Sequence, residues 1–97
     1  MSNRITQKNL EGFAQTLNEV TGNPTKPYVT GEDGKLVAQI GCYHISYAYG
    51  GASLHRMAGE HGGVSDVFGA GHMPKRELWD RMHAFLRGYE AGAQHNA

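Results

Sequence analysis

Helix-forming patterns stand near both ends of the 97-residue chain, and an extended, glycine-rich middle separates them. In the first pattern, Thr6 is a candidate N-cap, and Gly22 stands where a left-handed residue closes the last turn of a helix. Apolar side chains recur between these residues at spacings of three and four, which places them on one helical face: Leu10, Phe13, Leu17 and Val20. The pattern predicts an amphipathic helix between Thr6 and Gly22.

A second amphipathic helix is predicted after Pro74, which suits the first helical turn because that turn leaves its amides unpaired. Its apolar positions follow the same helical spacing: Leu78, Met82, Phe85, Leu86 and Tyr89. Gly88 and Gly92 weaken the pattern, and we expect the tail at about residues 91–97 to be frayed.

The segment between Pro27 and Tyr49 has the pattern of extended chain. Its first part predicts a β-hairpin, because Asp33 and Gly34 supply the backbone angles of a tight turn between two apolar runs.

Beyond this hairpin the apolar residues change parity. They alternate first on even and then on odd positions: Leu36, Ala38 and Ile40, followed by Tyr43, Ile45, Tyr47 and Tyr49. A strand shows one face every second residue, so a regular strand cannot keep both sets on the same face. We therefore expect a bulge or a very tight turn at Gly41 and Cys42.

The region from Gly50 to Gly71 carries seven of the chain's 14 glycines, too many for a long regular helix. The stretch SLHRMA within it could form a single helical turn or a short edge strand. We expect the region as a whole to be a structured loop.

These elements predict one α+β domain spanning residues 1–97, in which two helices pack on a small antiparallel β-sheet. The order is helix, β-hairpin or meander, glycine-rich loops, helix. The helices most simply cover one face of the sheet and leave the other to solvent or to a partner subunit. Apolar residues on both parities of the strand region favour a homodimer or a larger assembly.

Composition excludes several classes of function. Nine basic residues balance nine acidic ones, so no net charge attracts the chain to nucleic acid or to an anionic membrane. The first residues lack the apolar core of a signal peptide, and we expect a cytoplasmic protein. Cys42 is the single cysteine, and we expect it to be a buried, reduced thiol. No cofactor is expected.

The start of the second helix is a candidate anion site. Free backbone amides and the positive end of the helix dipole coincide there with Lys75 and Arg76. Alternatively, these two side chains are solvated and partly paired with Glu77 and Asp80.

Aromatic and glycine residues next to this helix extend the candidate ligand site. Tyr43, Tyr47 and Tyr49 could form a stacking platform for a base, although alternating aromatics are more often core residues. Glycine lets the backbone approach a ligand closely. The remaining candidate ligand-binding residues are Gly50, Gly51, His55, Arg56 and His72.

The histidines of this region do not show the spacing of a metal site, and we expect none. His55 with Glu60, or His72 with Asp66, could act as acid and base. No serine stands in a nucleophile motif, so we expect a binding protein and not an enzyme.

The strings YHISYAYGGASLHRM and GHMPKRELWDRMHAFLRG resemble a family of small, uncharacterised accessory proteins encoded by tailed bacteriophages. The resemblance covers most of the chain from the first helix to Tyr89 and brings no active site with it. It implies a protein made in the infected bacterial host, where such accessory proteins commonly bind and block a host component.

Two functions follow from this context. The first is the sequestration of a small, phosphate-containing, nucleotide-type defence signal, for which aromatics, glycines and cations stand close together in the sequence. The alternative is the inhibition of a host defence enzyme by an exposed aromatic and methionine surface. The candidate residues for that surface are Tyr47, Met57, Phe68 and Met73.

Overall fold

The computed structural model describes residues 4–95 of the chain and confirms the α+β fold. Its strands form two antiparallel sheets, one of two strands (β1-β2) and one of three (β3-β4-β5). The elements, in chain order, are α1 (Gln7–Thr21), β1 (Tyr28–Thr30), β2 (Leu36–Ala38), β3 (Tyr43–Ala48), β4 (Gly51–Met57), β5 (Val64–Asp66) and α2 (Lys75–His95).

The predicted ends of α1 are confirmed. The Thr6 hydroxyl accepts the Asn9 amide at 3.1 Å, and the Asn9 side chain accepts the Thr6 amide at 3.0 Å, which forms a reciprocal cap. Gly22 ends the helix in the left-handed conformation, with φ of 74°. The apolar face was predicted wrongly at Val20, which is 42% exposed, because the buried stripe of the helix continues instead through the polar Asn18.

Helix α2 begins directly after Pro74, as predicted, and runs through both glycines to His95. The tail predicted to fray overlaps this helix at residues 91–95, and residues 96–97 lie outside the described part of the chain. A buried row of helical side chains holds α2 on the body of the protein, and it includes Leu78 and Met82.

The predicted hairpin and the predicted break after it are both present. Strands β1 and β2 pair across a turn in which Gly34 has φ of 80°. Gly41, with φ of 96°, then occupies a turn closed by the Cys42 amide on the Gln39 carbonyl at 3.2 Å. The Gly41 amide donates to the Met57 carbonyl at 2.8 Å, and the Met57 amide donates to the Cys42 carbonyl at 2.9 Å. Two residues therefore oppose one, so this segment is both a tight turn and a bulge.

Gly41 cannot be replaced without strain. A side chain there would meet the Asn23 Oδ1 atom at 2.6 Å, and its positive φ disfavours any residue with a Cβ. The bulge sends β2 and β3 into different sheets, which explains why the apolar parity changes at this position.

The structured-loop prediction for residues 50–71 is wrong in part, because β4 lies in that region as the central strand of the three-stranded sheet. Strands β3 and β4 join through Tyr49 and Gly50, whose φ values of 55° and 74° are those of a two-residue hairpin turn. Three consecutive residues of β4 are buried, so the strand lacks the apolar alternation that identifies a half-buried strand: Ala52, Ser53 and Leu54.

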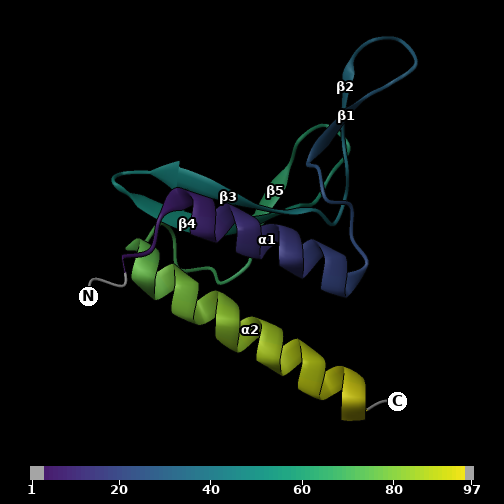
Figure 1. The fold of residues 1–97 in the computed structure, drawn as a ribbon. Coiled ribbons are helices and arrows are strands. Elements are labelled where there is room, and N and C mark those ends of the chain that lie inside the picture. Colours follow the sequence, from purple (N-terminus) through teal and green to yellow (C-terminus); the bar gives the residue numbers. More distant parts are fainter. Residues whose placement is uncertain (1–3, 96–97) are drawn as a thin grey trace.

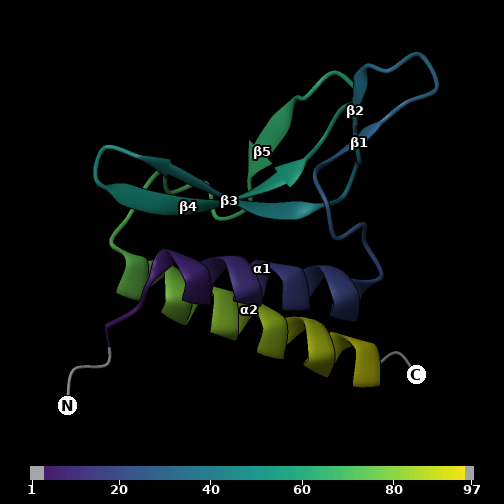
Figure 2. The same ribbon diagram turned by 45° about the horizontal axis from the view of Figure 1, so that its top comes forward.

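The three-stranded sheet has both helices on one face, as predicted (Figures 1 and 2). Helix α1 packs mainly on β3 and α2 on β4, and the two helices lie side by side. The β1-β2 hairpin projects away from this layered body (Figure 1). The main core lies between the helices and the sheet: Leu10, Ala14, Leu17, Tyr43, Ala52, Leu54, Met73, Leu78 and Met82. Cys42 is a buried free thiol in a second, smaller cluster with Ala38 and Met57.

Asn18 fastens α1 to the free edge of the sheet. Its side-chain oxygen accepts the Tyr43 amide at 2.7 Å, and its side-chain nitrogen donates to the Tyr43 carbonyl at 2.9 Å. The carboxamide therefore pairs with β3 as the backbone of a neighbouring strand would. All of these groups are buried, so each needs the other as its hydrogen-bond partner for the fold to be stable.

Replacing Asn18 with Ala should lower the free energy of unfolding by roughly 2 to 4 kcal/mol, because a buried amide and a buried carbonyl lose their partners. Urea denaturation measures this change. Gln15→Ala, at an exposed position on the same helix, is the matched control and should change stability little. Equal stability of the two variants would contradict the role given to Asn18.

Candidate functional site

Three histidine rings gather on the face of the sheet that the helices leave uncovered. His44 of β3 lies opposite His55 of β4, so both side chains project from the same face, with ring centroids 5.9 Å apart. The ring centroid of His72, which comes from the loop before α2, lies 6.0 Å from that of His55. Ser46 and Ser53 form the next opposed pair on this face. We call this set of five residues the histidine face: His44, Ser46, Ser53, His55 and His72.

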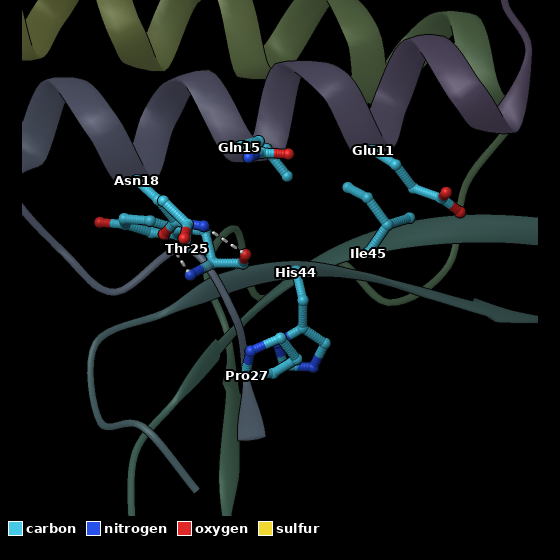
Figure 3. Close-up of a pocket in the computed structure, with 9 residues that line it drawn as sticks. Glu11, Gln15, Asn18, Thr25, Pro27, His44 and Ile45 are labelled. Carbon is cyan, nitrogen blue, oxygen red and sulfur yellow. Dashed lines mark hydrogen bonds between the residues drawn. The ribbon is translucent and has the colours of Figure 1, made fainter. Parts of the chain in front are cut away.

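The helices lie on the other side of this sheet. Tyr43, which neighbours His44 in β3, contacts the ring of Phe85 on α2, and successive residues of a strand point to opposite faces. Figure 3 shows His44 directed away from α1. The histidine face is therefore outside the helix-covered core.

A loop wrapped around one carboxylate sets the position of His72. Asp66 accepts hydrogen bonds from the amides of Phe68, Gly69 and Gly71 at 3.2, 3.1 and 2.9 Å. Desolvation raises the pKa of Asp66, but these amides and the Ser53 hydroxyl outweigh it, and the pKa is lowered overall. Asp66 is therefore a charged structural anchor for the loop.

His72 reaches back from this loop to β3. Its Nε2 atom lies 3.1 Å from the Ser46 hydroxyl, within hydrogen-bonding distance. On its other side, its ring contacts Tyr49, with centroids 5.9 Å apart. The hairpin tip and the loop thus meet at the imidazole of His72.

Two polar atoms of the histidine face are buried without a hydrogen-bond partner in the described chain: His44 Nδ1 and Ser53 Oγ. The Ser53 hydroxyl is near enough to Asp66 to help lower its pKa, but it does not reach good hydrogen-bonding geometry. Burial lowers the pKa of His44. The Cys42 carbonyl is near enough to the ring to oppose this shift but does not reach good hydrogen-bonding geometry, and His55 adds to the lowering. An unpartnered buried group of this kind calls for a ligand or an ordered water.

The chemistry of the face is that of imidazole and hydroxyl groups. A neutral imidazole offers one donor and one acceptor, and a protonated one offers two donors. No group of three or more His, Cys, Asp or Glu side chains within residues 4–95 is placed to hold a metal ion. The arrangement suits hydrogen bonding to a polar or anionic ligand.

The structure divides the predicted ligand-binding residues between the two sides of the sheet. His55, His72 and Tyr49 lie together at the histidine face or beside it. Gly50 belongs to the turn that presents Tyr49, and Gly51 allows close approach of Met73, because an added Cβ would lie 2.8 Å from the Met73 carbonyl oxygen.

Tyr43, Tyr47 and Arg56 do not reach the histidine face. Tyr43 is 7% exposed and belongs to the core, where the Arg56 guanidinium lies 5.3 Å from its ring centroid. The Tyr47 hydroxyl donates to the Glu11 carboxylate on α1 at 2.8 Å, and burial together with Glu11 raises the pKa of Tyr47. The structure thus gives no three-tyrosine stacking platform.

Lys75 and Arg76 begin α2, as predicted, but this helix lies on the opposite side of the sheet from the histidine face. The chain crosses the sheet edge at Met73, which exchanges backbone hydrogen bonds with Ala52 at 2.8 and 2.9 Å. The cations at the helix start and the histidines therefore do not form one site.

His44, Ser46 and Ser53 were not among the predicted site residues. A signal for them exists in the mirrored strings HIS and SLH on either side of Tyr49 and Gly50. A two-residue turn at that point pairs each histidine with a histidine and each serine with a serine. The missing step was to recognise Tyr49-Gly50 as a hairpin turn.

A hollow, which we call the edge cavity, lies between α1 and the free edge of β3 (Figure 3). Its volume is about 190 Å³. Three segments supply its lining: Glu11, Ala14, Gln15 and Asn18 from α1, Thr25 and Pro27 from the following connection, and Tyr43, His44 and Ile45 from β3.

Comparison with known proteins finds no matching family model, no similar curated protein and no similar solved structure. Among the described residues, neither helix combines the length and apolar character needed to span a bilayer. Function must therefore be inferred from the geometry of these two sites.

The lowered pKa of His44 predicts a pH-dependent stability. The folded protein binds a proton on His44 less readily than the unfolded chain, so protonation favours unfolding. Stability should therefore fall as the pH drops below the usual histidine value of 6.5 towards the lowered value in the folded protein. Urea midpoints measured across this range should show a shallower pH dependence for His44→Asn. The exposed-site variant His61→Asn should keep the slope of the parent, and an unchanged slope in His44→Asn would contradict this assignment.

Proposed function

We propose that the protein binds a small phosphate-containing ligand on the histidine face. The observation that carries this proposal is the convergence of His44, His55 and His72 from two strands and a loop, with His44 Nδ1 buried and unpartnered. Ser46 adds a hydroxyl within hydrogen-bonding distance of His72. Such a set of donors matches the several acceptor oxygens of a phosphate group.

Proton uptake supplies the charge that this site otherwise lacks. Burial and the neighbouring His55 lower the pKa of His44, which favours its neutral form before a ligand binds. A bound anion acts in the opposite direction and raises the pKa of the imidazoles around it. Affinity should therefore be coupled to protonation, and it should rise as the pH falls towards the histidine range.

A nucleotide fits the surroundings of the face better than inorganic phosphate. Tyr49, at the tip of the β3-β4 hairpin, is 99% exposed and lies next to His72. An exposed ring beside a phosphate site can stack on a nucleobase. Tyr49 is thus the one residue of the predicted three-tyrosine platform that belongs to the proposed site.

The biological role that we propose follows from the resemblance to bacteriophage accessory proteins. In the cytoplasm of an infected bacterium, the protein would sequester a nucleotide-type defence signal and thereby block the host response that depends on it. Binding without turnover suffices for this role. The proposal therefore requires affinity and does not require catalysis.

His55→Ala and His72→Ala should each weaken nucleotide binding at least about tenfold, because a charge-assisted hydrogen bond contributes roughly 1.5 to 3 kcal/mol. Isothermal titration calorimetry with AMP, ADP and a cyclic dinucleotide measures the effect, and adenosine, which lacks phosphate, is the matched ligand control. His61→Ala, at an exposed position in the β4-β5 connection, is the control variant.

The parent should bind members of this panel more tightly near pH 6.5 than near pH 8, whereas adenosine should bind weakly at both values. Absence of binding across the panel would contradict the proposal. Equal affinity of the parent and the His72→Ala variant would place the ligand elsewhere.

The alternative function, inhibition of a host enzyme by protein binding, is supported by a surface other than the one predicted from the sequence. Met57 and Met73 are buried, and Phe68 packs against the core, so the expected aromatic and methionine surface is absent from the described residues. The projecting β1-β2 hairpin instead carries exposed apolar side chains, namely Tyr28, Val29, Leu36 and Val37, and Ile40 in the turn after it is also exposed. A two-stranded sheet is marginally stable by itself, so a partner on this hairpin would stabilise it.

The same surface motivates the proposed homodimer or larger assembly. Leu36, which is 70% exposed, is the most exposed aliphatic side chain of the hairpin. Light scattering at micromolar concentration should give at least a dimer mass for the parent and a smaller mass for Leu36→Lys, because a charge at an apolar interface is costly. Gln7→Lys on α1 is a control for added charge. A monomer mass for the parent would contradict self-association.

A further inference from the structure

The free edge of β3 presents a row of backbone hydrogen-bonding groups. β3 is an edge strand, and the backbone groups of successive residues in its neighbour β4 point alternately towards β3 and away from it. The Leu54 carbonyl accepts from Val67, and Ala52 pairs with Met73, so both residues bond away from β3. In an antiparallel pair, the residues opposite them also point outward. These β3 residues are Ile45 and Tyr47, and Tyr43, two residues before Ile45, points in the same direction.

The first outward position in this row already has a partner. The Asn18 carboxamide accepts the Tyr43 amide at 2.7 Å and donates to the Tyr43 carbonyl at 2.9 Å. This edge therefore accepts a planar amide in the position of an added strand.

The second outward position, at Ile45, lies in the edge cavity. The alternation along β3 directs the backbone amide and carbonyl of Ile45 away from β4, on the same side as those of Tyr43. A cavity volume of about 190 Å³ is below the usual range for small-molecule pockets, and it suits a short length of extended chain. Figure 3 shows Glu11 and Gln15 on the α1 side of the cavity and Ile45 on the side of β3.

The charge of the residues that line the cavity also indicates which kind of side chain it binds. Among the lining residues the ionisable groups are Glu11, Tyr43 and His44. The Glu11 carboxylate accepts a hydrogen bond from Tyr47 at 2.8 Å and is otherwise exposed. A basic side chain held at the cavity would lie beside this acidic group.

We propose that the edge cavity binds an extended peptide segment of a partner protein, which adds to β3 through the backbone of Ile45 and places a lysine or arginine beside Glu11. Strand addition of this kind takes affinity from the main chain and specificity from the adjacent side chains. The edge cavity shares His44 with the histidine face, but the groups proposed to bind the peptide belong to Ile45 and Glu11, which are not part of that face, so peptide binding is tested separately from nucleotide binding.

The test uses blocked tripeptides and the folded, ¹⁵N-labelled protein. The probe is Ac-Val-Lys-Val-NH₂, and its matched control carries a methyl group on the lysine backbone nitrogen, which removes one strand hydrogen bond and keeps every side chain. Millimolar probe should shift the Ile45 amide resonance. The methylated peptide should bind roughly five- to tenfold more weakly, the effect expected for one hydrogen bond.

Two variants test the role of the acidic group. Glu11→Gln should weaken binding of the lysine peptide and leave that of Ac-Val-Nle-Val-NH₂ unchanged, because norleucine carries no charge. Glu19→Gln, an exposed carboxylate on the same helix outside the cavity lining, should change neither.

Three outcomes would overturn the proposal. The first is no shift at Ile45 with millimolar peptide. The second is equal binding of the methylated peptide. The third is an Ile45 shift that depends on protein concentration without peptide, because a second copy of the chain would then occupy the edge.

Discussion

The pairing between the Asn18 carboxamide and the backbone of Tyr43 is the contact on which the arrangement of the remaining elements depends. It fixes α1 against the free edge of β3 at 2.7 and 2.9 Å, with every participating group buried. β3 is the strand that contributes His44 and Ser46 to the uncovered face and Ile45 to the edge cavity. A shift of α1 along β3 would therefore disturb the edge cavity and the support of the histidine face together.

The bulge at Gly41 acts with this pairing to separate the two faces of the strand. It places Tyr43 towards the helices and thereby directs His44 to the opposite side. The hairpin turn at Tyr49-Gly50 then repeats this alternation in β4, so that like residues oppose one another. The bulge and the hairpin turn bring His44 and His55 together, and the loop around Asp66 adds His72.

Both helices and the first hairpin were predictable because their signals are local. Thr6, Gly22 and Pro74 mark helix boundaries within a few residues of the apolar pattern that they delimit. Strand β4 was not predictable in the same way. Leu54 is buried in the core under the helices, and Ser53, on the opposite face, is buried as deeply, so the sequence of β4 carries no simple alternation.

The candidate site was predictable only in part, for a similar reason. His55 and His72 stood out as polar residues among glycines, but their convergence with His44 depends on strand register and on the Asp66 loop. Tyr43 and Arg56 were assigned to the site from proximity in sequence. Alternation along the strands places both of them on the other side of the sheet from His44 and His55.

Nuclear magnetic resonance of the histidine side chains tests the histidine face most directly as the ligand site. Long-range ¹H–¹⁵N spectra resolve each imidazole while AMP is added to the folded protein. The account predicts that the ring signals of His44, His55 and His72 shift together and saturate at the same AMP concentration. His61, in the β4-β5 connection, and His83, stacked on Phe13 in the helix layer, should stay unchanged. Shifts confined to His61 or His83, or no shift at the three clustered rings, would contradict it.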